Sequence, residues 1–443
     1  MKKLLLSVVL MSGGAAFAQS WVVQNTGFFS ESRGISEIRI VDPNTVWALA
    51  YDGLDPTSEI QEFTKTTDGG ATWTPGTIDV GDPALAINNI CPIDADIAFV
   101  SVVDPDNGGG GIFQTVDGGI TWFGVIPDGF QQPTSFCNWV HFFDENTGIA
   151  VGDPLANNQF EHWRTTDGGA TWDLVTTPTA AANEWGYNGG NVAVGNTAWV
   201  VTNKGKLLKT SDAGATWVKL NTPLTDFSGA SVNGRVIFSD ENIGLILATT
   251  NGGTSYSVYR TFDGGATWGA AEPWTGGWNR ILSYVPGTQT IVATTMATTG
   301  GAIPGSSYSN DNGVTWTTID SGEQRGYTAF WDGSTGWAGG FNEDSVTGGI
   351  FKLSGTLAVG DHAAVGKITA YPNPTSSILN IANASSEIVE VAIFDFLGKQ
   401  VLTQQFSAMN NVEVNLSSLQ TGAYIARVKD VNGAMQTIQV TRK

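Results

Sequence analysis

The stretch Thr165-Thr166-Asp167-Gly168-Gly169-Ala170-Thr171-Trp172 decides the fold of this chain, because five other stretches share its pattern of Ser/Thr-x-Asp-x-Gly-x-Thr-Trp. The aspartates of the six copies are separated by 49, 50, 45, 51 and 48 residues. A nearly constant period of this size indicates one supersecondary unit per repeat. The chain is therefore a repeat protein, and the repeated aspartates are Asp68, Asp117, Asp167, Asp212, Asp263 and Asp311.

Each copy has the chemistry of a tight hairpin turn. The aspartate accepts hydrogen bonds from backbone N–H groups, glycine adopts positive φ, and a threonine hydroxyl closes the loop. A strand pattern such as Leu207-Leu208-Lys209 stands before each copy, and another such as Trp217-Val218-Lys219 follows it. We therefore predict that the six aspartates are structural, and that each Trp starts a return strand and packs as a wedge between repeats.

Each repeat also carries two earlier strands, as in residues 138–143 and 149–152 of the third one. Four short strands in about 48 residues are typical of a propeller blade. A seventh unit ends at Gly349-Ile350-Phe351-Lys352 without a turn motif or outer strand, whereas Trp21-Val22-Val23-Gln24 is an outer strand without its blade. We predict an all-β fold, a seven-bladed β-propeller over residues 19–355, in which the two ends pair and leave few exposed sheet edges.

The six copies resemble the Asp-box (BNR) repeats of sialidases, sortilin-type receptors, xyloglucan-degrading propellers and a photosystem assembly factor family. The resemblance covers roughly residues 21–355 and implies a propeller fold. In these families the boxes lie at hairpin tips away from the ligand face. The resemblance therefore leaves the function of this chain open.

Residues 1–18 have the pattern of a secretory signal peptide. Lys2 and Lys3 precede an apolar run over residues 4–11, and Ala16-Phe17-Ala18 forms a small-residue cleavage site. The apolar run is too short to span a bilayer, and no later stretch reaches the required length. We expect a secreted or surface protein that passes through the periplasm and has no transmembrane segment.

The composition changes after a small-residue linker at residues 356–366, because residues 367–443 contain no Trp and no further turn motif. Alternating strand patterns separated by glycines predict a small C-terminal β-sandwich. This region resembles the type A C-terminal sorting domain of the type IX secretion system of Bacteroidota. The resemblance rests on Tyr371-Pro372-Asn373-Pro374, the Asp395…Gly398-Lys399 turn, Gly422-Ala423-Tyr424 and the basic Arg442-Lys443 end. It implies export across the outer membrane, with the secretion machinery as a partner of residues 367–443.

The charge of residues 19–366 is strongly acidic, with 13 Lys and Arg against 36 Asp and Glu. Such a surface repels phosphates, so we expect no nucleic-acid partner. We expect no cofactor, although acidic loops such as Asp104-Pro105-Asp106-Asn107 leave Ca²⁺ as an open alternative. Cys91 and Cys137 should be free, buried thiols, and the three histidines have no metal-ligand spacing.

Long polar loops that enter the first strand of a blade, or join its second and third strands, should open on one face. Trp185, Trp274 and Trp278 lie in such loops among glycines and charges, where an indole ring can stack on a sugar or peptide group. Arg280 and Arg325 offer forked donors to carboxylates. We predict a ligand site at Trp185, Trp278, Arg280 and Arg325. In the alternative interpretation, the rings pack on neighbouring blades and the arginines pair with carboxylates such as Glu323.

The function expected from these features is that of a non-catalytic binding or scaffold module for a glycan or protein ligand. The alternative is a glycoside hydrolase acting on extracellular polysaccharide. A xyloglucanase-like site needs two carboxylates about 5 to 10 Å apart, and the candidates are Asp153, Glu184, Glu323 and Asp344. A sialidase-like site would have to use Arg33, Arg280 and Arg325. The sequence does not select a catalytic residue.

Overall fold

The computed structural model describes residues 19–55, 57–126, 129–250, 255–276, 278, 281–295, 303–357, 368–383, 387–395, 399–431 and 435–443. The predicted signal peptide, Arg280, His362 and most of the predicted linker lie outside these residues. The chain divides into two compact units, Met1–Val359 and Gly360–Lys443. The described residues form strands and contain no helix that could cross a membrane.

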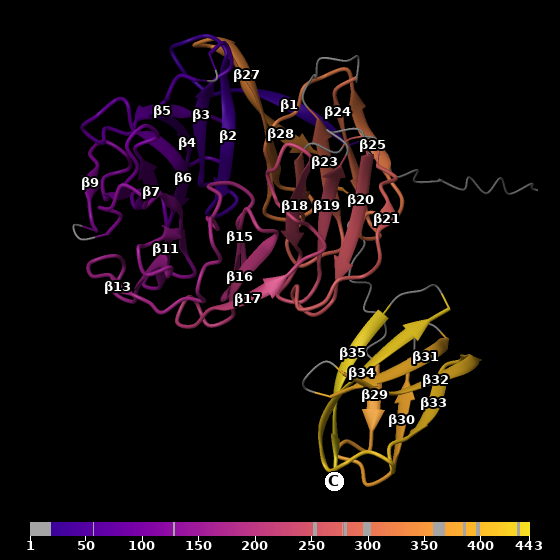
Figure 1. The fold of residues 1–443 in the computed structure, drawn as a ribbon. Coiled ribbons are helices and arrows are strands. Elements are labelled where there is room, and N and C mark those ends of the chain that lie inside the picture. Colours follow the sequence, from indigo (N-terminus) through magenta and orange to yellow (C-terminus); the bar gives the residue numbers. More distant parts are fainter. Residues whose placement is uncertain are drawn as a thin grey trace, which may run out of the picture. The chain divides into compact units, whose positions relative to one another are not determined.

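The first unit is a β-propeller of four-stranded antiparallel meanders that follow one another around the unit (Figure 1). In the described residues, five meanders form sheets of their own. Their strands are β6 (Ala86–Pro92), β7 (Ala98–Val103), β8 (Gly110–Thr115) and β9 (Phe123–Gly124); β10 (Cys137–Phe142), β11 (Gly148–Pro154), β12 (Phe160–Thr165) and β13 (Asp173–Leu174); β14 (Val192–Val194), β15 (Thr197–Val201), β16 (Lys206–Thr210) and β17 (Val218–Asn221); β18 (Val232–Phe238), β19 (Gly244–Thr250), β20 (Ser255–Thr261) and β21 (Glu272–Pro273); and β22 (Ile281–Tyr284), β23 (Ile291–Thr295), β24 (Gly305–Ser309) and β25 (Thr317–Ser321).

The two ends of the propeller meet in one larger sheet. It contains β2 (Arg33–Ile40), β3 (Val46–Asp52), β4 (Glu62–Thr66) and β5 (Thr74–Thr77), together with β26 (Thr328–Phe330), β27 (Gly336–Asp344), β28 (Thr347–Ser354) and β1 (Ser20–Asn25). β1 pairs antiparallel with β28, so that Trp21 faces Leu353, which confirms the predicted pairing of the chain ends. β27 and β2 touch through Phe341 and Gly34. The total of seven blades stays a prediction.

Aromatic side chains fill the space between neighbouring meanders. Phe99 of β7 stacks on Phe142 of β10 at 4.2 Å between ring centroids, and Trp199 of β15 stacks on Phe238 of β18 at 3.7 Å. The motif residue Trp122 does the same, because its ring lies 6.2 Å from that of Phe63 in the preceding meander. The predicted wedge packing is thus confirmed for this Trp, and burying such rings stabilises each contact between meanders.

The six motif turns share one hydrogen-bond pattern. The first Ser or Thr hydroxyl donates to the Asp Oδ1 at 2.7–2.9 Å and accepts from a glycine N–H at 2.8–2.9 Å. The second Thr donates its N–H to Oδ1 at 2.8–2.9 Å and its hydroxyl to Oδ2 at 2.5–2.6 Å. Hydrogen bonds from Thr72 and Thr121 hold the pKa of Asp68 and of Asp117 at about 2. Both carboxylates are therefore turn acceptors in their ionised form.

The second unit consists of two sheets around one apolar core, as the sequence predicts. The first sheet contains β29 (Thr369–Tyr371), β30 (Ile378–Ala382) and β33 (Asn411–Asn415). The second contains β31 (Ile388–Phe394), β32 (Gln400–Met409), β34 (Gly422–Asp430) and β35 (Met435–Arg442). Leu379, Val391 and Val414 are fully buried between the sheets.

Cys91 and Cys137 are free and buried, as predicted. Burial raises the pKa of Cys91 to about 11, so this thiol stays protonated at neutral pH. His141 lies in β10 and His162 in β12. Burial lowers the pKa of each imidazole to about 3. Both rings are therefore neutral members of the propeller interior.

Candidate functional site

The antiparallel order of each meander separates two kinds of connection. The motif turns join the third strand to the fourth at one end of the sheet. Segments that enter the first strand, and loops between the second and third strands, lie at the other end, which we call the loop face. Because these segments differ from meander to meander, specific binding groups are expected here.

Trp185 lies on the loop face in the connection between β13 and β14, and 44% of its surface is exposed. Its backbone N–H donates to Asn203 Oδ1 at 2.9 Å, and its carbonyl accepts from the Asn203 N–H at 3.1 Å. The Lys204 ammonium lies 5.9 Å from the indole centroid. The backbone that carries this exposed ring is therefore fixed.

Asp153 lies beside this segment at the end of β11. Its Oδ1 accepts a hydrogen bond from Asn138 Nδ2 at 2.7 Å and one from the Gly186 N–H at 2.9 Å. Burial raises the pKa of Asp153 to about 6, although these two donors act in the opposite direction. Within the described residues no hydrogen bond to Oδ2 is present. This oxygen is the free acceptor of the site.

Two further asparagines connect the segment to the two preceding meanders. Asn188 Nδ2 donates to Asn88 Oδ1 at 3.0 Å, and Asn88 Nδ2 donates to the Cys137 carbonyl at 2.9 Å. The connection that carries Trp185 thus reaches β6 and β10. We call Asn88, Asn138, Asp153, Trp185 and Asn188 the Trp185 cluster. The sequence indicated Trp185, and Asp153 as a candidate acid, but no pattern marked the three asparagines.

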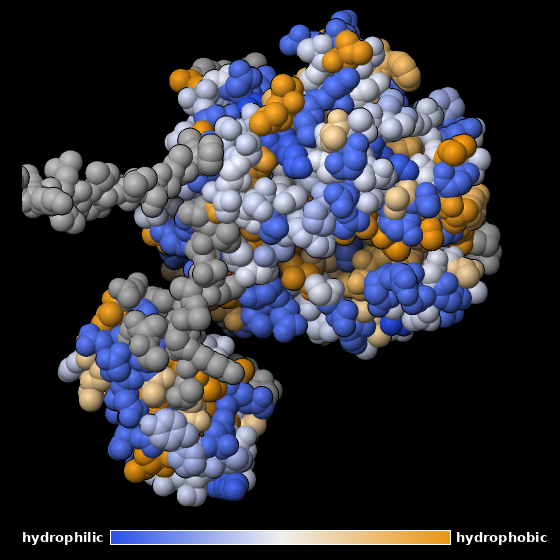
Figure 2. Space-filling model, turned by 180° about the vertical axis from the view of Figure 1, so that it is seen from behind, coloured by the Kyte–Doolittle hydropathy of each residue, from blue (hydrophilic) through white to orange (hydrophobic). Residues whose placement is uncertain are grey.

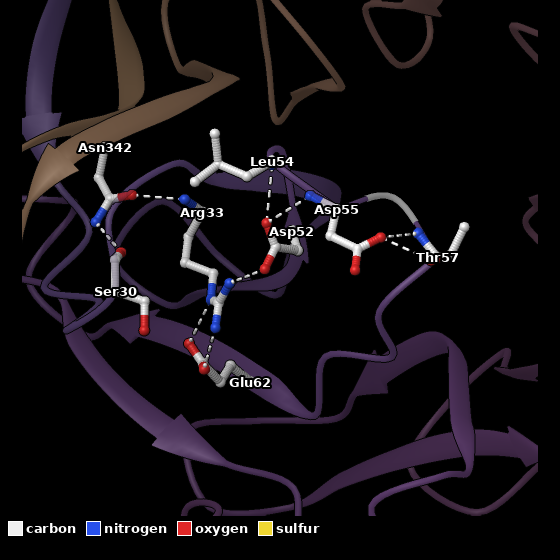
Figure 3. A network of polar contacts seen from close by, with 8 residues as sticks. All are labelled: Ser30, Arg33, Asp52, Leu54, Asp55, Thr57, Glu62 and Asn342. Atoms are coloured by element: carbon white, nitrogen blue, oxygen red, sulfur yellow. Dashed lines mark hydrogen bonds and ion pairs between the residues drawn. The ribbon is translucent and has the colours of Figure 1, made fainter.

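A second polar network surrounds Arg33 at the start of β2 (Figure 3). The guanidinium pairs with Asp52 at 2.7 Å and with Glu62 at 3.3 Å. Asp52 Oδ1 also accepts the N–H groups of Leu54 and Asp55, and these backbone bonds together with Arg33 lower the pKa of Asp52. Arg33 is therefore committed to neighbouring carboxylates.

The other predicted ligand residues have partners within the propeller. Trp278 is half-buried in the apolar cluster around β19 and β23, and its Nε1 donates to the Ile303 carbonyl at 3.1 Å. Arg325 is 4% exposed, pairs with Asp320 at 2.6 Å and lies 3.9 Å above the Phe351 ring. Their described contacts do not bring them to Trp185, and Arg280 lies outside the described residues.

The remaining carboxylate candidates differ in their environment. Glu184 is buried and accepts hydrogen bonds from the Ala181 N–H, Thr202 and Lys219, the last at 2.7 Å. Glu323 and Asp344 are exposed. Among the residues that the structure describes, no group of three His, Cys, Asp or Glu side chains is arranged to hold a metal ion. Asp104 accepts three hydrogen bonds from Asp106 and Asn107 of its own loop.

Two open grooves lie elsewhere on the described surface. An open groove of about 870 Å³ runs between β5 and the turn at Asp117, and one of about 590 Å³ lies between β1 and the turn at Trp73. Both separate an outer strand from the motif turn of the next meander. Repetition of the fold accounts for their position, and neither contains a residue of the Trp185 cluster.

Comparison with known families matches residues 369–441 to the secretion system C-terminal sorting domain. The chain is therefore exported by the type IX secretion system to the cell surface or secreted, as predicted. No curated protein matches the chain.

Among solved structures, YCF48 bound to D1 peptide covers 77% of this chain and 97% of its own at 16% identity and a TM-score of 0.49. An ancestral GH74 enzyme covers 94% of this chain and 63% of its own at 13% identity and a TM-score of 0.46. A polysaccharide lyase named PL25 ulvan lyase covers 75% and 96% at 11% identity and a TM-score of 0.45. Because each TM-score is below 0.5, these names assign no activity to this chain.

Proposed function

We propose that this propeller is a non-catalytic binding module of the cell surface or extracellular medium, and that its ligand binds on the loop face. The observation that carries the proposal is the Trp185 cluster. It offers an exposed indole ring, a fixed carboxylate with one free oxygen, and asparagine side chains from two other meanders. Such a combination of stacking surface and oriented polar groups supports recognition of a glycan or a polypeptide.

The charged groups of the loop face support binding over hydrolysis. Asp52 and Glu62 hold Arg33, and Glu184 holds Lys219, so these carboxylates already have cationic partners. A hydrolase with two carboxylates needs a pair that faces the substrate across about 5 to 10 Å. In the described residues Asp153 alone combines a free oxygen with a raised pKa at the Trp185 cluster.

The test combines a glycan array and a polysaccharide hydrolysis panel with the exported protein and its Trp185→Ala and Asp153→Asn variants. We expect a ligand whose affinity falls about tenfold in either variant, since a buried contact of this kind is worth about one factor of ten. No polysaccharide should be cleaved. A wild-type protein that cleaves a polysaccharide, with the activity lost in Asp153→Asn, would contradict the proposal.

One observation favours a second candidate, a glycoside hydrolase. A carboxyl group with a pKa of about 6 is suited to protonate a leaving group, and burial gives Asp153 that property. The hydrolase would need a second carboxylate opposite Asp153. The hydrolysis panel distinguishes the two candidates directly.

We also propose that residues 367–443 are the segment that the secretion machinery recognises. The family match over residues 369–441 supports these bounds. A chain that ends at residue 366 should fold as a propeller and accumulate in the periplasm, as measured by cell fractionation and immunoblotting. Its efficient appearance in the medium would contradict the assignment.

A further inference from the structure

Three large apolar side chains are exposed on the loop face where the two ends of the propeller meet. Phe29 lies between β1 and β2, Leu54 follows β3, and Val346 lies between β27 and β28. They are 87%, 70% and 73% exposed. Figure 2 shows apolar and hydrophilic atoms adjoining at the upper end of the propeller unit, the end that β27 reaches in Figure 1. Scattered apolar residues are common on protein surfaces, but a group on adjoining loops marks an interaction site.

A single buried side chain joins the loops that carry these residues. Asn342 Nδ2 donates to the carbonyls of Phe28, Ser30 and Asp344 at 2.8–3.1 Å, and its Oδ1 accepts from the Arg33 N–H at 2.7 Å. These bonds fix the backbone on both sides of Phe29 and at Asp344, two residues before Val346. Asn342 is 3% exposed, so breaking them would leave polar groups unpaired in the interior.

The Leu54 turn is tied to the same point. The Ser32 N–H donates to the Asn342 carbonyl at 3.0 Å, and the Gly53 N–H donates to the Ser32 carbonyl at 2.9 Å. Asp52 closes the turn through the Leu54 N–H, as Figure 3 shows. A Cβ atom at Gly53 would lie 2.4 Å from the Phe341 ring, so the turn packs directly on β27. The three apolar side chains therefore project from one fixed framework.

The surroundings of this group are acidic. The loops that carry the three side chains contain seven carboxylates and one arginine. That arginine is Arg33, which Asp52 and Glu62 already neutralise. The carboxylates that remain exposed around the group are Glu31, Asp55, Glu59, Glu343 and Asp344.

We propose that Phe29, Leu54 and Val346 form a docking surface, here called the apolar triad, for a polypeptide segment that combines apolar side chains with Lys or Arg. The apolar side chains would cover the triad, and the cations would lie against the exposed carboxylates. Charge complementarity of this kind selects the partner and accelerates its association. Because the framework is already fixed, the loops lose less conformational entropy on binding. The inference rests on the loop face being the binding face, as proposed above, but it uses no residue of the Trp185 cluster.

A second copy of the chain is a poor occupant of this surface, because two acidic rims would face each other and the chain has a net charge of −20. A membrane of anionic lipids is repelled for the same reason. A polypeptide with basic groups meets both the apolar and the electrostatic requirement. This is the partner to which the proposal commits.

The probes are three short fluorescent peptides, one of alternating Lys and Leu, one of Lys and Ser, and one of Glu and Leu. Binding to the exported protein is measured by fluorescence anisotropy at low and at physiological ionic strength. We expect the Lys and Leu peptide to bind at least about tenfold more tightly than either other peptide. The Lys and Ser peptide lacks the apolar side chains, and the Glu and Leu peptide lacks the cations. Salt should weaken this binding.

The variant Phe29→Ser/Leu54→Ser/Val346→Ser should weaken binding of the Lys and Leu peptide about tenfold or more. The matched control is Ile120→Ser, which removes an 82% exposed apolar side chain from a motif turn at the other end of the sheets. This control should bind as the wild type does. Circular dichroism and thermal unfolding check that all variants are folded.

Several outcomes would overturn the proposal. One is that the Lys and Ser peptide binds as tightly as the Lys and Leu peptide, and another is that the triad and Ile120 variants lose the same peptide affinity. The others are tighter binding to phosphatidylcholine vesicles than to the peptide, and a dimer in sedimentation that is absent in the triad variant. Trp185→Ala separates this proposal from the preceding one. Peptide binding that survives Trp185→Ala but not the triad variant supports the triad even if no ligand is found for the Trp185 cluster.

Discussion

The two ends of the propeller sheets follow different rules. At the motif end, six turns repeat the same hydrogen bonds, each closed within eight consecutive residues. At the loop face, single side chains such as Asn342 and Asn88 join segments that are far apart in the chain. The repeated hydrogen bonds of the motif turns are local, whereas the hydrogen bonds of the loop face depend on unique residues. A binding site on the loop face, as proposed above, would be built from these unique residues.

The ionisation of carboxylates at the two ends differs in the same way. Hydrogen bonds from Thr72 hold the pKa of Asp68 at about 2, so this turn prefers the charged form. Burial raises the pKa of Asp153 at the loop face to about 6, so this site prefers the neutral form. The charged form of Asp153 therefore lowers the stability of the fold at neutral pH, and a carboxylate with such a raised pKa is a candidate functional group.

The largest effect is expected for Asn342→Ala. The substitution leaves the Arg33 N–H and the carbonyls of Phe28 and Ser30 without their partner inside the protein. We expect the free energy of unfolding to fall by about 4 kcal/mol, because several buried polar groups lose their hydrogen bonds together. Urea denaturation followed by tryptophan fluorescence measures this change.

Asn44→Ala is the control for this prediction, since Asn44 is exposed in the turn between β2 and β3 at the motif end. It should change the unfolding free energy by less than about 0.5 kcal/mol. The Lys and Leu peptide should lose affinity for the Asn342 variant alone. If Asn342→Ala lowered the unfolding free energy as little as Asn44→Ala does, the contrast between the two ends would be wrong.

The second prediction concerns pH. The pKa of Asp153 is about 6 in the folded state and about 4 in an unfolded chain, so the folded protein binds more protons between these values. The contribution of Asp153 to the free energy of unfolding is therefore fully present below about pH 4 and lost as the pH rises through about 6. Asp153→Asn should be more stable than the wild type by about 2 kcal/mol near pH 7.5, and this difference should vanish near pH 4. Urea denaturation across this range measures it.

The control for the pH dependence is Asp144→Asn in the turn after β10. Backbone N–H groups of Asn146 and Thr147 lower the pKa of Asp144, so the sign is reversed. Its stabilising contribution is present above about pH 4 and lost as the pH falls through the folded-state pKa. For each variant, the measured quantity is the difference in unfolding free energy from the wild type as a function of pH. If this difference changed with pH in the same direction for Asp153→Asn and Asp144→Asn, burial would not control the pKa of the loop-face carboxylate.

The parts of the fold that the sequence predicted are those that repeat or that complete a repeat. The motif spacing predicted the hairpin turns, and the unpaired strand at Trp21 predicted the pairing of β1 with β28. Asn342 could not be recognised, because its importance depends on Phe28, Ser30 and Arg33, which lie more than 300 residues away. The environment of Asp153 likewise depends on Asn138 and Gly186 from other segments. Position in space, not residue type, distinguishes these groups.

A smaller effect is expected for Asp212→Ala in the fourth motif turn. The variant loses the hydrogen bonds from Thr210 and from the N–H and hydroxyl of Thr216. Because water replaces part of this loss at a surface turn, the unfolding free energy should fall by only about 1–2 kcal/mol. Peptide affinity at the loop face should stay within about twofold, since the turn is at the other end of the sheet. Asp173→Ala, an exposed aspartate of the adjacent meander, is the stability control.

The smallest effect is expected for Ala213→Gly, which tests whether the motif turns are interchangeable. Ala213 has a φ of 52°, whereas glycines occupy the same place in other turns, such as Gly168 with a φ of 72°. Relief of the left-handed strain, about 1 kcal/mol, exceeds the entropic cost of glycine by a small margin, so the variant should be about 0.5 kcal/mol more stable. Asn312 occupies this place in the sixth turn with a φ of 60°, but its Oδ1 accepts the buried Tyr284 hydroxyl. Asn312→Gly should therefore destabilise the protein. Urea denaturation that gives the same sign for the two variants would contradict this difference between the two turns.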